Sequence, residues 1–294
     1  MSAYWKVILD YDGTLTAEEE QVTALADKSL DTLARDILRV PRSRLEEDYR
    51  IAREALLAAP HQHWWEVNGL IASYCDEGAF ILNTSTLQAM LRGNPDYLRA
   101  VTRAFPSAEY DPVVDCTNYL FHRHTAELAP CFRPETRAVL AELMAHPSFV
   151  PLVLTNSLGD KVQRNLSTLG LGELVILGDT RQYEMDPHWG QWFSHPRWGR
   201  IQILPVDELH QVDLRRPAYY RALRGEMSSG AGLVVVADTL SLPGALPLVM
   251  GIPFVLLRTP YTPPWCLDFV AAHPLGHVLD ELAGLPCLLT TLCA

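Results

Sequence analysis

Short apolar runs, each bounded by turn residues, recur along the chain and predict five buried strands. These runs are residues 5–10, 149–155, 174–177, 233–237 and 253–257. Helical patterns separate them: Val139, Leu140 and Leu143 share one helix face, and Ser157 stands at a predicted N-cap of the next helix. Apolar strands that alternate with helices are typical of a parallel sheet covered on both faces. The pattern therefore predicts an α/β fold with a Rossmann-like parallel sheet core.

Residues 16–130 interrupt this alternation, because they show helical patterns and no convincing strand pattern. Leu30, Leu33 and Ile37, for example, fall on one helix face. So long a helical stretch, inserted directly after the first strand, predicts a mostly helical cap domain. The core would then comprise residues 1–15 and 131–294.

A second interruption covers residues 181–205, which are rich in Trp and Pro ("YEMDPHWGQWFSHPRWGR"). We expect an irregular excursion or a hairpin within the core. Its tryptophans, Trp189, Trp192 and Trp198, are expected to contribute packing rather than a platform for substrate.

Composition narrows the class of protein. The chain has 294 residues, 48% of them hydrophobic and 20% charged, as in ordinary soluble globular proteins. The formal net charge of -11 argues against a nucleic acid or an anionic membrane as the main partner. The six cysteines show no C-x-x-C spacing, and no secretion signal is recognisable, so we expect reduced thiols and a cytoplasmic location. The oligomeric state stays open.

The candidate catalytic residues lie where the predicted strands end. Asp10 and Asp12 follow the first strand, Thr155 and Asn156 end the second, and Asp238 ends the fourth. In an open parallel sheet, ligands bind beyond the carboxyl ends of the strands. Three acids, a hydroxyl at a helix start and a fixed cation, Arg216, are the parts that phosphoryl transfer needs, with Mg²⁺ between carboxylates and phosphate. Lys161 is the alternative cation.

Four motifs in order resemble those of the haloacid dehalogenase superfamily. "ILDYDGTLT" resembles its Asp-x-Asp-Gly-Thr motif, "PLVLTNS" its second motif, "RRPAYYRAL" its third and "LVVVADT" its fourth. Residues 16–130 stand where phosphatases of that family carry a helical cap. The resemblance implies a phosphatase rather than a dehalogenase, because dehalogenases of the family lack an acid at the position of Asp12.

The resemblance also implies roles for individual residues. Asp10 would be the nucleophile that forms an aspartyl-phosphate, and Asp12 the general acid and then the general base. Gly13, Thr14, Thr155, Asn156 and Arg216 would surround the phosphate. Asp10, the main-chain carbonyl of Asp12 and Asp238 would hold Mg²⁺.

One departure from the family pattern keeps alternatives open. The family has a further acid four or five residues after the position of Asp238, where this chain has Leu242 and Pro243. Mg²⁺ keeps several waters and needs few protein ligands, so an Mg²⁺-dependent phosphatase of a small phosphorylated metabolite remains the first hypothesis. A non-catalytic binding or regulatory protein with the same fold is the second. A phosphotransferase or mutase would use the same residues.

Overall fold

The computed structural model describes residues 4–106, 111–227 and 230–293. The remaining residues of the predicted core (1–3, 228–229 and 294) and of the predicted cap (107–110) lie outside the described part. The chain forms two compact units. We call Met1–Ala17 with Pro130–Ala294 the sheet unit, and Glu18–Ala129 the helical unit.

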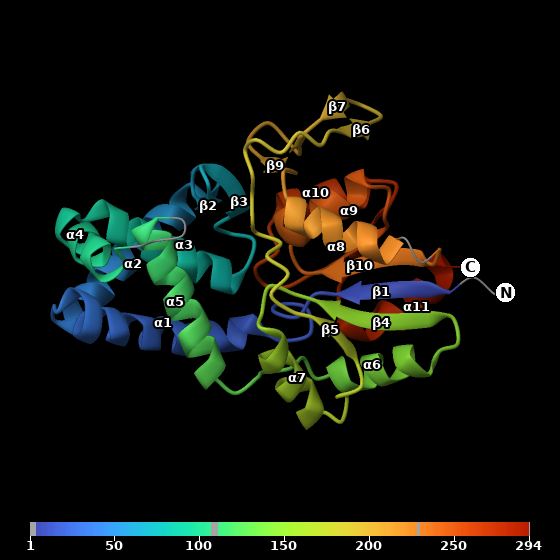
Figure 1. Ribbon diagram of the computed structural model, residues 1–294, viewed down its shortest axis with the longest axis horizontal. Coiled ribbons are helices and arrows are strands. Elements are labelled where there is room, and N and C mark those ends of the chain that lie inside the picture. The colour runs from blue at the N-terminus through green and yellow to red at the C-terminus, as the bar shows by residue number, and fades with distance from the viewer. Residues whose placement is uncertain (1–3, 107–110, 228–229, 294) are drawn as a thin grey trace. The chain divides into compact units, whose positions relative to one another are not determined.

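The sheet unit is built on six parallel strands in the order β12-β11-β10-β1-β4-β5 (Figure 1). Their bounds are β1 Trp5–Leu9, β4 Phe149–Leu154, β5 Val175–Leu177, β10 Gly232–Ala237, β11 Phe254–Leu257 and β12 Gly276–Leu279. The five predicted strands are all present, so the α/β class with a parallel sheet is confirmed. The sixth, β12, escaped prediction because its sequence GHVL contains no apolar run. It lies at the sheet edge, where only Leu279 is buried.

Helices cover both faces of this sheet, with α8 and α10 on one side and α6 and α7 on the other (Figure 1). The helices of the unit are α6 Thr136–Ala145, α7 Gly159–Thr168, α8 Pro217–Met227, α9 Ala245–Val249, α10 Pro264–Ala272 and α11 Leu285–Leu292. Val7 and Leu9 of β1 pack in one buried cluster with side chains of α6, α7 and α11. Ile8, also buried, points to the opposite face, because side chains alternate along a strand. The central strand is therefore buried on both faces at Val7–Leu9, whereas Lys6 near its start forms an ion pair with Glu226 at 2.6 Å.

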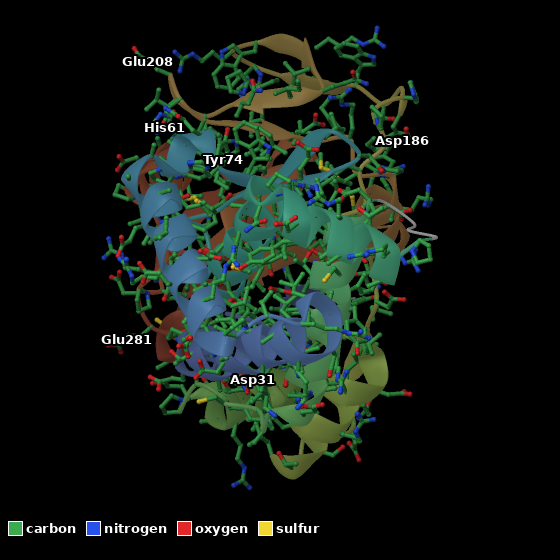
Figure 2. The ribbon with its side chains drawn as sticks, turned by 90° about the vertical axis from the view of Figure 1, so that its left-hand side faces the viewer. Asp31, His61, Tyr74, Asp186, Glu208 and Glu281 are labelled. Atoms are coloured by element: carbon green, nitrogen blue, oxygen red, sulfur yellow. The ribbon has the colours of Figure 1, made fainter. Side chains whose placement is uncertain are left out.

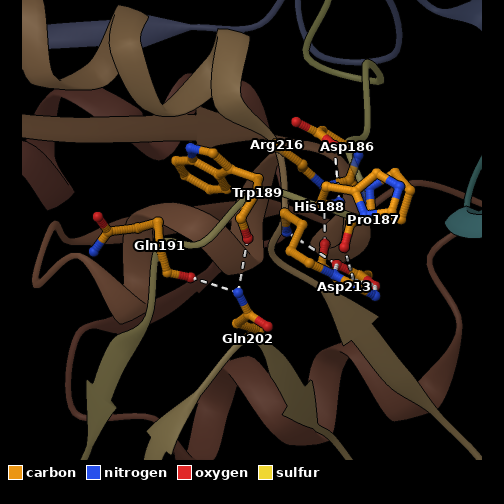
Figure 3. A network of polar contacts seen from close by, with 9 residues as sticks. Asp186, Pro187, His188, Trp189, Gln191, Gln202, Asp213 and Arg216 are labelled. Atoms are coloured by element: carbon orange, nitrogen blue, oxygen red, sulfur yellow. Dashed lines mark hydrogen bonds and ion pairs between the residues drawn. The ribbon is translucent and has the colours of Figure 1, made fainter.

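The Trp- and Pro-rich segment folds into short antiparallel pairs. β6 Phe193–His195 pairs with β7 Gly199–Ile201, and β8 Ile203–Pro205 pairs with β9 Gln211–Asp213. Before β6 the chain is irregular, and the side-chain amide of Gln202 fastens it by donating to the carbonyls of Trp189 (2.8 Å) and Gln191 (3.0 Å; Figure 3). Trp189 packs against Phe193 and Tyr220, as a structural tryptophan does.

The helical unit contains α1 Glu18–Thr32, α2 Arg42–Ala58, α3 Ala79–Gly93, α4 Pro95–Ala104 and α5 Pro112–Glu127. Leu30, Leu33 and Leu87 belong to its buried core. Its surface is rich in ion pairs, such as that of Asp31, labelled in Figure 2, with Arg42 at 2.8 Å. Among the described residues, no helix of either unit has the length and apolarity that crossing a bilayer requires.

The expectation that residues 16–130 contain no strand is wrong. β2 Trp64–Val67 and β3 Leu70–Tyr74 form an antiparallel hairpin in the helical unit. Asn68 and Gly69 connect them, with φ of 52° and 75°. Positive φ at both turn residues is the geometry that Asn-Gly favours between two strands. The sequence therefore carried the hairpin signal, but the surrounding helical patterns obscured it.

Candidate active site

The candidate residues lie at the carboxyl ends of three adjacent strands. β1 lies between β4 and β10, and Leu9 is in register with Val153 and Val236. Asp10 and Asp238 each follow the last residue of their strands directly, and so does Thr155. The Asp10 N–H donates to the Val236 carbonyl at 3.0 Å, which continues the ladder past the end of β1. Parallel pairing therefore brings two acids and a hydroxyl together at the carboxyl ends of the strands.

The pKa of the Asp10 carboxyl responds to burial and to two neighbouring acids. It is raised well above the ordinary value by desolvation first, then by the charges of Asp238 and Asp12, while the Tyr11 N–H opposes the shift. The residue itself remains partly exposed. Like charges held this close favour either a proton or a bound cation.

The turn after β1 is built around Gly13. Its φ is +79°, and a Cβ at this position would lie 2.0 Å from Oδ2 of Asp238. The Thr14 hydroxyl donates to the other oxygen, Oδ1, at 3.3 Å. Arg133 donates through Nε to the carbonyls of Gly13 and Thr14, both at 3.2 Å. The glycine thus allows the Asp238 carboxylate to lie directly against the turn that carries Asp12.

Asp12 is held by a residue whose role the sequence did not indicate. The Ser157 hydroxyl donates to Oδ2 of Asp12 at 2.6 Å, and Lys161 Nζ lies 3.3 Å from that hydroxyl and 4.0 Å from Oδ1 of Asp12. The prediction of Ser157 as an N-cap is wrong, because α7 begins at Gly159 after Leu158. Its hydroxyl is turned to the acid instead. Lys161, the alternative cation, lies beside Asp12 from the first turn of α7.

Thr155 and Asn156 are connected to the start of the Trp- and Pro-rich segment. The buried hydroxyl of Thr155 accepts from the Ser157 N–H at 3.1 Å, which orders the loop before α7. The Asn156 side-chain oxygen accepts from the Gln182 N–H at 2.7 Å. Gln182 is itself buried, and its amide donates to the Leu154 carbonyl at 3.2 Å. No motif in the sequence distinguishes Gln182 as a support of this loop.

Arg216 is fully buried directly before α8. Its Nε donates to the Asp213 carbonyl at 3.1 Å and its Nη1 to the Gln182 carbonyl at 3.2 Å. Gln182 therefore joins Arg216 to Asn156 through its own backbone. Figure 3 shows Arg216 next to Asp213 and next to Asp186, which belongs to the Trp- and Pro-rich segment. Carbonyl oxygens thus fix this guanidinium from two sides.

Tyr219, one helical turn after Arg216, was not anticipated from the sequence. It is 1% exposed, and its hydroxyl has no hydrogen-bond partner among the described residues. Burial raises the pKa of Tyr219, the charge of Asp10 raises it further, and Arg216 acts in the opposite direction. The phenol therefore lies within electrostatic range of the candidate nucleophile.

The positions of the missing acid are apolar and buried. Leu242 and Pro243 lie in the turn Leu240–Gly244, in which Leu242 has an extended backbone, and the Thr239 hydroxyl donates to the Leu242 carbonyl. Within the described ranges, no group of three or more His, Cys, Asp or Glu side chains is arranged to hold a metal ion. The set expected for Mg²⁺ has only two carboxylates, Asp10 and Asp238, and one carbonyl. These are hard oxygen donors, and the crowding of negative charge around Asp10 suits a divalent cation.

Comparison with known proteins supports the fold. No protein-family model and no curated protein matches the chain. Among solved structures, it is similar to a haloacid dehalogenase-like hydrolase from Streptococcus pneumoniae (12% identity, 98% of this chain and 99% of that chain, TM-score 0.51). It is also similar to a putative hydrolase of the same superfamily from Bacillus subtilis, whose structure is bound to magnesium and reveals interdomain movement. The identity is 12%, the match covers 98% of this chain and 99% of that chain, and the TM-score is 0.50. The chain therefore has the haloacid dehalogenase-like fold, as its four motifs predicted.

Proposed function

We propose that this protein is an Mg²⁺-dependent phosphatase that hydrolyses a small phosphorylated metabolite through an aspartyl-phosphate. The observation that carries the proposal is the gathering of Asp10, Asp12 and Asp238 at the carboxyl ends of adjacent strands, with the Asp12 carboxyl oriented by Ser157. The hydrolases of similar fold support hydrolytic chemistry in general, and the acid at position 12 favours a phosphate ester.

In the first half-reaction, a carboxylate oxygen of Asp10 attacks phosphorus, and the bond from phosphorus to the alcohol oxygen breaks. Asp12 enters protonated and gives its proton to the leaving oxygen. The Ser157 hydroxyl and Lys161 keep the Asp12 carboxyl group in place, which preserves the direction of proton transfer. The alcohol leaves, and phosphate remains as an acyl-phosphate on Asp10.

In the second half-reaction, the Asp12 carboxylate takes a proton from a water molecule as that water attacks phosphorus. The bond between phosphorus and the Asp10 oxygen breaks, so inorganic phosphate is released and the Asp10 carboxylate returns. Thr155 and Arg216 would bind the phosphoryl oxygens during both steps. Mg²⁺, held by Asp10, the Asp12 carbonyl and Asp238, would supply charge neutralisation of the carboxylates and phosphate.

We propose further that the helical unit acts as the cap that selects the leaving group. It is inserted between the first and second motifs, and only two chain connections, at Ala17–Glu18 and Ala129–Pro130, join it to the sheet unit. Two connections are suited to a hinge. Small-angle scattering should show a more compact protein after Mg²⁺ and vanadate are added together than with either alone. An unchanged radius of gyration contradicts a moving cap.

The apolar residues at 242 and 243 favour one competing function, a binding or regulatory protein without turnover. A panel of phosphate esters, assayed for phosphate release with Mg²⁺, separates the two. The phosphatase proposal expects release that Asp10→Asn abolishes. A folded protein that binds phosphate or vanadate, yet hydrolyses none of the panel, supports the binding protein. Adding acceptor alcohols to the same assay detects phosphotransfer to a second substrate.

A further inference from the structure

A cavity of about 460 Å³ lies within the sheet unit, outside the candidate active site. Its walls come from the β6–β7 hairpin, the turn between β8 and β9, and α10 with the residues that follow it (Figure 1). The lining includes none of the residues assigned above to the acids, the phosphate or the metal. A cavity of this volume accommodates a small organic molecule.

Three large aromatic rings contribute to the wall of this cavity, and two of them are stacked on histidines. Trp198 is stacked on His195, with ring centroids 4.3 Å apart and planes at 28°. Trp265 is stacked on His210 at 4.4 Å and 8°. Phe269 supplies a third ring. Stacked partners hold the indole planes in position, so the wall is organised before any ligand enters.

The charges on the wall favour a cation. Asp207 and Asp268 contribute two carboxylates, against one guanidinium from Arg197. Desolvation and Arg197 lower the pKa of His195, so this lining histidine adds no charge near neutral pH. Asp207 is already engaged by His210 at 2.9 Å, whereas Asp268 forms no ion pair in the described part of the chain. Asp268 is therefore the carboxylate available to a ligand.

The contacts of Arg197 show what kind of cation this wall accepts. Its guanidinium carbon lies 5.1 Å from the centroid of the Trp198 ring, within the range of a cation–π contact. A guanidinium is flat and delocalises its charge, which matches the flat indole faces. A planar ring that carries a positive charge combines the same attraction with stacking on Trp265 or Phe269.

We propose that this cavity is a second ligand-binding site, lined by Trp198, Trp265, Phe269 and Asp268, for a small planar organic cation. The site is independent of the proposed phosphatase chemistry. It also gives the Trp-rich segment a role beyond packing.

The test uses the full-length protein and a pair of probes that share one ring. 1-Methylnicotinamide is a planar pyridinium cation, and nicotinamide is nearly the same molecule without the charge. Calorimetry should detect binding of the cation and much weaker binding of nicotinamide. In fluorine NMR of 5-fluorotryptophan-labelled protein, which has seven tryptophans, the signals of Trp198 and Trp265 should move.

Two variants and a control locate the site. Asp268→Asn removes one exposed charge and Phe269→Leu removes one ring, and each should weaken binding by about fivefold or more. Glu281→Gln removes another exposed acid, outside the cavity (Figure 2), and should leave binding unchanged. Absence of binding, equal binding of the two probes, or full affinity in folded Asp268→Asn overturns the proposal.

Discussion

Ser157 Oγ donates a hydrogen bond of 2.6 Å to Oδ2 of Asp12, joining residues that are 145 positions apart. The same hydroxyl lies 3.3 Å from Lys161 Nζ. This arrangement leaves the Asp12 carboxyl group few orientations. It makes Ser157 a positioning residue for the proposed general acid and base.

Ser157→Ala should lower kcat for phosphate-ester hydrolysis by about tenfold and leave KM nearly unchanged, because the Asp12 carboxyl group loses the hydrogen bond that orients it while the phosphate contacts stay. Steady-state kinetics on the best substrate of the panel measure this. Ser167→Ala is the matched control, since that exposed hydroxyl of α7 only donates to the Gln163 carbonyl. Wild-type kcat in folded Ser157→Ala contradicts the positioning role.

Asp10→Asn should abolish turnover and raise the melting temperature measured without metal at pH 7. The amide keeps the shape of the side chain but removes the nucleophile and the repulsion from Asp238 and Asp12, which raise the pKa of Asp10. Scanning calorimetry and phosphate release test the two parts. Asp280→Asn, at an exposed acid paired with Arg258, should show no such rise. Residual turnover at the wild-type rate removes Asp10 from its proposed role.

Gly13→Ala should be more destabilising than Gly170→Ala, although both glycines have nearly the same φ, +79° and +77°. Each alanine carries the backbone cost of about 1–2 kcal/mol for a left-handed conformation. Only at Gly13 does the new Cβ also collide with Asp238, whereas nothing lies within 4 Å at Gly170. Urea unfolding compares the two. Equal losses of unfolding free energy indicate that Asp238 moves aside without cost.

Arg216→Lys should lower both the melting temperature and kcat, the latter by about tenfold. The two guanidinium nitrogens donate to the carbonyls of Asp213 and Gln182, and one ammonium cannot replace both. Arg224→Lys, at an exposed position of α8, is the control and should behave as wild type. If Arg216→Lys keeps full activity, a single positive charge is sufficient at this position.

Stability should decline as the pH falls below about 6.5, in part because of His273. Burial lowers the pKa of His273 from 6.5, and the nearby His195 contributes. Its Nδ1 accepts from the Leu275 N–H at 3.2 Å, so protonation there breaks that bond. The unfolded state then binds more protons than the folded state, and this contribution to stability is lost as pH falls from 6.5 through the folded pKa. Urea unfolding at pH 7.5 and 5.5 should show a smaller difference for His273→Asn, which keeps an acceptor but cannot titrate.

The sequence by itself determined five of the six strands and the residues that follow them. Apolar runs such as Val7–Leu9 must be buried, which predicts the strands. The carboxyl ends of parallel strands lie at the same end of the sheet, so Asp10, Thr155 and Asp238 could be placed together from local patterns alone. The four motifs added the haloacid dehalogenase-like fold, which the similar solved structures confirm.

Only the tertiary structure decided how those residues are held. The contacts of Ser157 with Asp12, and of Gln182 with Asn156 and Arg216, join segments that are distant in sequence, and no local propensity encodes them. The cavity beside α10 likewise unites Trp198 with Trp265 across separate elements. Side-chain hydrogen bonds and ring stacking act over a few ångströms in space, whatever the separation along the chain. Their partners are therefore set by packing of the whole sheet unit.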